Sequence, residues 1–80
     1  MASATNLTTV AHDVPITDDS IRLGQFLKLS SLIDSGSDAK AAIAGGLVEV
    51  NGERETRRGR QLRPGDTVSF GTESARVARG

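Results

Sequence analysis

Residues 48–66 read VEVNGERETRRGRQLRPGD, and two turn signals in this stretch decide how the second half of the chain folds. Asn51–Gly52 lies between two short strand-like segments and is the strongest short signal for a two-residue β-hairpin. In such a hairpin, Glu49 faces Arg54 across the two strands. The sequence Pro64-Gly65-Asp66 marks a second turn. We therefore expect a hairpin, a loop, and a turn that leads into a further strand.

The loop after the hairpin concentrates positive charge, although the 80-residue chain holds ten basic and ten acidic residues. Guanidinium groups match phosphate oxygens bidentately and stack on bases, so this loop favours a nucleic-acid ligand. Only Glu55 is near enough in sequence to neutralise it locally. Arg54 is weaker evidence, because an exposed ion pair with Glu49, worth about 0.2–1 kcal/mol, is its simpler explanation. The arginines of this segment are Arg54, Arg57, Arg58 and Arg60.

The charges are divided unevenly between the two halves of the chain. Residues 1–38 hold five acids and two bases, a net charge of −3. Residues 39–80 hold five acids and eight bases, a net charge of +3. The split indicates an anionic partner for the second half, with ordinary surface charge as the alternative.

A first helix is expected ahead of the hairpin. Leu23, Phe26 and Leu27 recur at the spacing of one helix face. Three residues before this stripe are candidates for capping the helix: Asp18, Asp19 and Ser20. The apolar residues that follow it are expected to help close the core: Leu29, Leu32 and Ile33.

A second helix fits residues 35–46, SGSDAKAAIAGG, with Ser37 as its cap and Gly45–Gly46 as its stop. Its apolar face would consist of Ala39, Ala42 and Ile43. The free amides at its start, next to Gly36, form a ready phosphate site. A cation in the first helical turn costs about 0.3–1 kcal/mol. Lys40 therefore suggests a role in binding, with a solvated lysine as the alternative.

The remaining segments predict strands. Residues 12–17 can form a strand that Pro15 confines to a sheet edge. Further strands are expected at residues 67–70 and 75–79. The predicted fold class is α+β, with two packed helices followed by a small antiparallel sheet that contains the β-hairpin. We expect residues 1–12 to be a flexible leader and residues 13–80 to be a single domain.

The composition is poor in catalytic groups. Cysteine and tyrosine are absent, and His12 is the only histidine. No nucleophile–base pair, metal-ligand spacing, P-loop or dinucleotide fingerprint is present. The chain has no apolar run long enough to span a membrane, and its first residues lack the pattern of a signal peptide. We expect no enzymatic activity, no cofactor, no metal, no membrane partner and a cytoplasmic location.

The aromatic residues restrict the kind of nucleic acid and the way it is bound. Phe26 and Phe70 are the only aromatics, and both fall on expected core faces. A sheet that stacks bases on exposed aromatics is therefore excluded. Recognition of shape and backbone remains, which is the mode expected for structured RNA. Periodicity alone does not separate RNA from DNA.

Four motifs follow one another along the chain: Arg22-Leu23, Ser35-Gly36-Ser37-Asp38-Ala39, Gly46-Leu47-Val48-Glu49-Val50-Asn51-Gly52 and Pro64-Gly65-Asp66. In this order they resemble the S-four-type RNA-binding domain, also called the alpha-L RNA-binding motif. The resemblance covers about 50 residues and implies that residues 13–80 form a single RNA-binding domain. It further implies a small stand-alone bacterial protein that binds RNA, ribosomal or tRNA-like, as a monomer, with ribosomal subunit proteins as neighbours.

In the family, RNA lies across the two helices and the strand after them, and this carries over to eight positions here. Many members have arginine between the two serines, where this chain has Gly36, which removes one expected phosphate contact. Gly24 is also unusual inside the first helix, at a cost of about 1 kcal/mol against alanine. The implied RNA-binding residues are Arg22, Lys28, Ser37, Lys40, Arg54, Arg57, Arg58 and Arg60.

Two other classes of function stay open. A ubiquitin-like sulfur carrier shares the size, a Val-Asn-Gly-Glu turn and a late strand, but it reacts through a C-terminal Gly-Gly. This chain ends Val-Ala-Arg-Gly, and the arginine cluster would have no explanation. The third class is a protein-interaction adaptor that uses the same basic face on an acidic partner.

Overall fold

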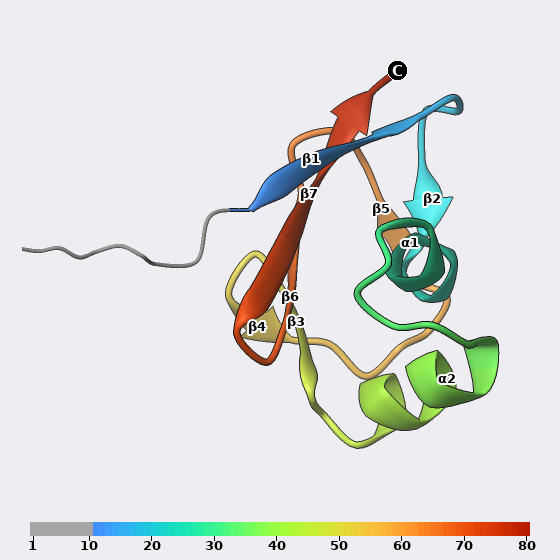
Figure 1. Cartoon of the computed structure of the whole chain (residues 1–80), viewed down its shortest axis with the longest axis vertical. Coiled ribbons are helices and arrows are strands. Elements are labelled where there is room, and N and C mark those ends of the chain that lie inside the picture. The colour runs from blue at the N-terminus through green and yellow to red at the C-terminus, as the bar shows by residue number, and fades with distance from the viewer. Residues whose placement is uncertain (1–10) are drawn as a thin grey trace, which may run out of the picture.

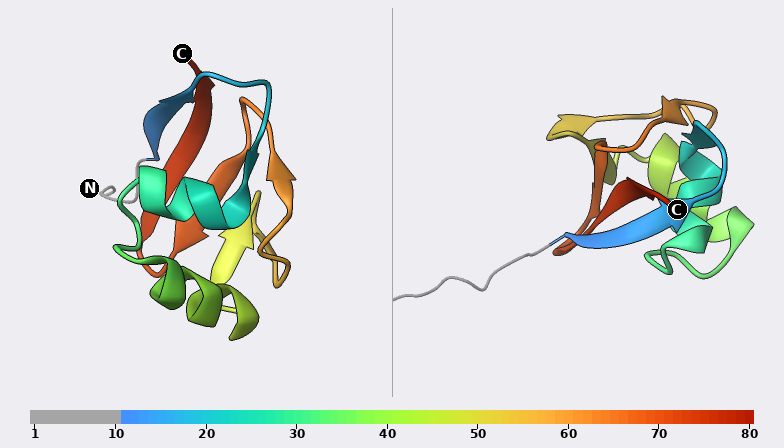
Figure 2. Two further views of the ribbon diagram at one scale, coloured as in Figure 1. Left: turned by 90° about the vertical axis from the view of Figure 1, so that its right-hand side faces the viewer. Right: turned by 90° about the horizontal axis from the view of Figure 1, so that it is seen from above.

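The computed structural model describes residues 11–80, and the predictions for residues 1–10 lie outside the described residues. Two helices cover one face of a sheet (Figures 1 and 2). The elements in chain order are β1 (His12–Ile16), β2 (Ile21–Arg22), α1 (Leu23–Leu29), α2 (Gly36–Ala44), β3 (Val48–Val50), β4 (Glu53–Arg54), β5 (Gln61–Leu62), β6 (Thr67–Phe70) and β7 (Glu73–Arg79). The α+β class is therefore confirmed.

The main sheet has the strand order β1-β7-β6-β3-β4. The pairs β3–β4, β3–β6 and β6–β7 are antiparallel, but β1 runs parallel to β7 with Val14 opposite Val77. The predicted antiparallel sheet therefore also includes one parallel pair. Parallel neighbours need a long crossover between them, and here nearly the whole domain separates the two strands. Pro15 lies on the edge strand β1, as predicted, where its missing N–H costs no ladder bond.

The predicted hairpin is confirmed, with Glu49 opposite Arg54. Asn51 and Gly52 have φ of 53° and 86°, the positive values that a two-residue type I′ turn requires. The side chain of Asn51 also reaches the second turn: its Nδ2 donates to Asp66 at 3.1 Å, and its Oδ1 accepts from the Thr67 amide at 2.9 Å. The two turn signals of the sequence are thus joined in space.

The core lies between the helices and the sheet. Leu23, Phe26 and Leu27 are fully buried, as their spacing predicts, and Ile33 is buried as well. Leu29 is 52% exposed, so its predicted core position is wrong. The next position of the buried stripe falls on Ser30, three residues after Leu27, which leaves Leu29 at the side. Ser30 satisfies its hydroxyl by donating to the carbonyl oxygen of Leu27 at 3.2 Å.

The start of α1 differs from the prediction. Residue Arg22 precedes the helix, and no side chain caps it. Instead, the amides of Leu23 and Gly24 donate to the backbone carbonyls of Arg60 and Arg58 at 2.8 and 3.1 Å. The capping role predicted for the acids and serine at residues 18–20 is wrong, because β2 separates them from the helix. This short strand pairs with β5, so the arginine loop lies against the start of α1 (Figure 2).

The start of α2 also shifts by two residues. Ser35 is the N-cap, and its hydroxyl accepts from the Asp38 amide at 3.1 Å, so the prediction of Ser37 as the cap is wrong. The spacing Ser35-x-x-Asp38 is the pattern of a capping box, which identifies the correct serine. Because α2 begins at Gly36, Lys40 is its fifth residue and lies beyond the first turn. The expected dipole cost therefore does not apply to it.

Candidate nucleic-acid interface

The arginine loop, residues 57–60, is organised around a buried carboxylate. Glu55 is 6% exposed, and its Oε2 accepts from the backbone amide and Nε of Arg57 at 3.1 and 3.0 Å. Its Oε1 accepts from Nη2 of Arg57 at 3.3 Å and from Nη1 of Arg60 at 3.0 Å. These side-chain bonds, first from Arg57 and then from Arg60, lower the pKa of Glu55 to about 2. The carboxylate in turn raises the pKa of Arg57.

Arg58 is held in a different way from its neighbours in the loop. Its aliphatic stem lies on Gly24, and a Cβ added at Gly24 would be only 2.7 Å from Cγ of Arg58. Within the described residues, its guanidinium has no acidic partner within 4.0 Å. The unusual glycine of α1 is therefore explained by this close approach. The guanidinium of Arg58 is therefore available to bind an anion.

Arg58 reaches a hollow between the two helices and the arginine loop. Lys28, in the last turn of α1, extends toward α2, where its Nζ lies 3.9 Å from the place of a Cβ on Gly36. The hollow has a volume of about 330 Å³, and three cations from three segments meet there without an acidic lining residue. Its lining residues are Gly24, Lys28, Gly36, Ser37, Ala39, Lys40 and Arg58.

Backbone donors add to the positive potential of this hollow. The amides of Gly36 and Ser37 stand in the first turn of α2 and have no partner among the described residues. Such amides, together with the helix dipole, attract anions. Gly36 has room for a side chain, since its nearest neighbour would be at an ordinary contact distance. The hollow can therefore hold a phosphate group between three cations and two amides.

The structure brings some predicted site residues together and leaves others apart. Ser37, Lys28, Lys40 and Arg58 line the hollow. Arg22 is exposed next to the arginine loop but does not line the hollow. Arg54 lies at the other end of α2, with its Cδ 3.0 Å from the place of a Cβ on Gly46.

The predicted ion pair between Glu49 and Arg54 is wrong: among residues 11–80 these two side chains form no salt bridge, although their Cα atoms are partners in the hairpin. The stem of Arg54 lies over Gly46 instead, where the C-terminus of α2 attracts a cation. Arg54 is thus exposed at the C-terminal end of α2, whereas the hollow lies at the start of this helix.

In the sequence, Glu55 stands out only as a local counter-charge, and Gly24 only as a cost to the helix. The sequence gives only a weak indication of the structural role of Glu55, because the order of the residues does not show that its side chain is buried. The signal for Gly24 was stronger, since a glycine inside a short helix often marks a close approach of another segment. Its partner, Arg58, is 34 residues away and could not be found from the sequence.

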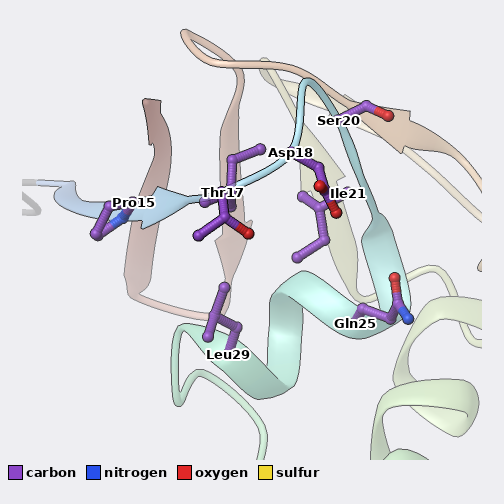
Figure 3. A pocket seen from close by; sticks show the side chains of 8 residues that line it. Pro15, Thr17, Asp18, Ser20, Ile21, Gln25 and Leu29 are labelled. Carbon is purple, nitrogen blue, oxygen red and sulfur yellow. The ribbon is translucent and has the colours of Figure 1, made fainter. Parts of the chain in front are cut away.

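A second hollow, of about 400 Å³, opens on a neighbouring face of α1 (Figure 3). Gln25 and Leu29 rise into it from the helix, while Thr17 and Asp18 line its other side. Its only charged lining residue is Asp18, which would repel a phosphate. This hollow is therefore separate from the basic face.

The described part of the chain offers neither a metal site nor a membrane-spanning helix. Among residues 11–80, no group of three or more His, Cys, Asp or Glu side chains is placed to hold a metal ion. No helix in the same range is long and apolar enough to cross a membrane. The basic face, meaning the hollow together with the arginine loop and the exposed Arg22 and Arg54, is the candidate site.

Comparison with known proteins gives consistent matches. Residues 14–78 match the S4 domain. The chain is 46% identical over 61 residues to the "Probable ribosome maturation protein RlbA" of Bacillus subtilis (strain 168), covering 76% of this chain and 86% of that protein. It is 44% identical over 57 residues to YbcJ of Escherichia coli (strain K12), covering 71% of this chain and 81% of that protein.

Solved structures agree with the sequence matches. The solution structure of YbcJ from Escherichia coli, described as revealing an alfaL motif involved in RNA-binding, superposes with a TM-score of 0.62 at 35% identity. The superposed region covers 98% of this chain and 95% of the YbcJ chain. The 30S ribosomal protein S4e of Thermoplasma acidophilum has a TM-score of 0.58 at 28% identity, covering 75% of this chain and 32% of that one. The resemblance found in the sequence is confirmed, and the chain belongs to the S4 domain family.

Proposed function

We propose that this protein binds structured RNA, with ribosomal RNA as the ligand class, and that it does so without catalysing a reaction. The observation that carries the proposal is the hollow of about 330 Å³ in which Lys28, Lys40 and Arg58 meet. Three cations from three segments, with free amides at a helix start, suit the phosphate groups of a nucleic-acid backbone. Ser37 contributes a hydroxyl at the same place.

The relatives support ribosomal RNA within this class. One is named a ribosome maturation protein, one has a motif described as involved in RNA-binding, and one is a protein of the 30S ribosomal subunit. We therefore place the action of this protein on the ribosome or its precursors, where ribosomal subunit proteins would be its neighbours. A cytoplasmic location follows from this ligand. In this proposal the domain acts as a monomer, and it begins one residue before the expected boundary at residue 13, because His12 pairs with Ala75 in the sheet.

The aromatic residues support backbone contact as the mode of binding. Phe26 is fully buried, and Phe70 is partly buried against the core. Neither is presented for stacking on bases, so recognition rests on phosphates, 2′-hydroxyls and shape. All eight predicted residues keep their proposed role, with the hollow as the centre and Arg22 and Arg54 at its margins.

The test is the affinity of the protein for a folded ribosomal RNA fragment, measured by fluorescence anisotropy. The same fragment in unfolded form and a DNA duplex of the same sequence are the controls. We expect clear preference for the folded RNA, because the amides and cations of the hollow are fixed in space. Equal affinity for the DNA duplex, or no binding of RNA, would refute the proposal.

The two alternatives have distinct outcomes. An adaptor for an acidic protein would keep its partner after nuclease treatment of the purified complex, whereas an RNA-bound complex would fall apart. A sulfur carrier would form a thiocarboxylate with an activating enzyme, which intact mass would reveal. Neither the family match nor the relatives point to sulfur transfer.

A further inference from the structure

Glu55 is an acid that binds two arginines of a face that should attract phosphate. It is 6% exposed, and it receives four hydrogen bonds from Arg57 and Arg60. By charge alone it should weaken RNA binding, because it lowers the positive potential of the face. Its burial and its full set of donors indicate instead that it shapes the loop.

We propose that Glu55 is a positioning residue for RNA binding, which fixes the arginine loop so that Arg58 is presented at the hollow. The inference rests on the function proposed above and assigns a role to a residue that does not itself touch RNA. In this arrangement Arg57 and Arg60 are held by Glu55, and Arg58 is the cation of the loop left without an acid among the described residues.

The loop is fixed from two sides. On one side, Glu55 holds the side chains of Arg57 and Arg60 at 3.0 Å. On the other side, the carbonyls of Arg58 and Arg60 accept from the first amides of α1, and the Arg60 amide donates to the Arg57 carbonyl at 3.2 Å. Arg58 lies between these anchors, with its stem on Gly24. Loss of the Glu55 bonds would release one of the two anchors.

Such anchoring favours binding because less freedom is lost when the ligand arrives. A long side chain that is immobilised only in the complex loses rotamer freedom on binding, and this loss weakens the affinity. The side chain of Arg57 is 76% exposed and that of Arg60 is 30% exposed, so each can approach RNA while Glu55 keeps its orientation. Arg57 retains one unbonded guanidinium nitrogen, since its Nε and Nη2 are taken.

The proposal predicts an effect opposite in sign to that of simple electrostatics. Glu55→Gln removes a negative charge from the basic face and keeps the size of the side chain. If only net charge matters, affinity for RNA rises. If Glu55 positions the loop, affinity falls by about fivefold or more, because two arginine side chains must then be ordered on binding.

The experiment compares the wild-type protein with Glu55→Gln and with Glu53→Gln, using the folded ribosomal RNA fragment. Glu53 is exposed on the same hairpin and forms no ion pair within 4.0 Å among the described residues, so it gives the same charge change as a control. We expect Glu53→Gln to bind as tightly as the wild type or more tightly. An affinity of Glu55→Gln equal to or above that of Glu53→Gln would overturn the proposal.

A measurement on the wild type covers the case in which Glu55→Gln does not fold. The Nε–H of Arg57 should give a resolved, exchange-protected NMR signal because it donates to Glu55 at 3.0 Å. We expect this protection to persist when RNA is added. Loss of the signal on binding would show that Arg57 leaves Glu55 and would overturn the role of Glu55 as a fixed anchor.

Failure of this inference can be told apart from failure of the proposed function. A wild-type protein that does not bind RNA refutes both. A wild type that binds RNA, together with a Glu55→Gln variant that binds equally well, refutes only the positioning role. Salt titration adds a further readout: Glu55→Gln should keep the wild-type slope, because the phosphate contacts remain, while the whole curve moves to weaker binding.

Discussion

Gly24 determines where the free cation of the arginine loop lies. Arg58 occupies the space that a Cβ at this position would take, 2.7 Å from its Cγ. Alanine is a better helix former than glycine by about 1 kcal/mol, so Gly24→Ala would stabilise α1 if only the helix mattered. We expect the free energy of unfolding to rise by less than about 1 kcal/mol, because the added Cβ must push the stem of Arg58 aside. RNA affinity should fall about fivefold, because Arg58 is displaced although no charge is lost. Urea unfolding and fluorescence anisotropy measure the two effects.

Gly59→Ala is the matched control in the same loop. A Cβ at Gly59 would meet nothing within 4 Å, and its φ is not in the positive region. We expect RNA affinity to be unchanged and stability to rise by about 0.4–1 kcal/mol, through the lower entropy of the unfolded chain. If both glycine variants had the same effect on RNA affinity, the packing of Arg58 against Gly24 would not matter for binding.

The arginine loop, as an element, depends on the ionised form of Glu55. Its pKa is about 2 in the folded protein against 4.5 for a free glutamate, because Arg57 and Arg60 donate to the carboxylate. A lowered folded-state pKa means that the stabilisation is complete above about pH 4.5 and is lost as the pH falls through about 2. We expect the difference in unfolding free energy between wild type and Glu55→Gln to shrink over this pH window. A difference that stays constant from pH 7 to pH 2 would contradict the ionic anchoring of the loop.

At the scale of the whole molecule, the features set by neighbouring residues could be predicted, and those set by distant segments could not. The Asn51–Gly52 turn, the stop at Gly45–Gly46 and the buried stripe of α1 depend on local spacing, and all are confirmed. The parallel pairing of β1 with β7 depends on a contact between the two ends of the domain. The capping of α1 by the carbonyls of Arg58 and Arg60 likewise joins segments more than 30 residues apart, so serine and acid patterns near the helix were misleading.

The positions of the charged residues explain how a chain with zero net charge can bind an anionic ligand. The basic residues outside the face are paired with acids or lie elsewhere. Arg76 pairs with Asp13, and Nη1 of Arg79 lies 3.6 Å from Oδ1 of Asp19. Arg63 lines a different hollow. Lys28, Lys40 and Arg58 instead meet without an acid among the described residues that line their hollow. Position, and not total charge, then decides the interaction with RNA.

The most direct test is the salt dependence of RNA affinity in two triple variants that lose the same charge. One is Lys28→Ala/Lys40→Ala/Arg58→Ala in the hollow, and the other is Arg63→Ala/Arg76→Ala/Arg79→Ala outside it. Each phosphate contact contributes about 0.7–0.9 to the slope of log K against log salt concentration, so the first variant should lose about 2–3. The second should keep the wild-type slope and nearly the wild-type affinity. Equal losses of slope in the two variants would contradict the account, because binding would then follow net charge alone.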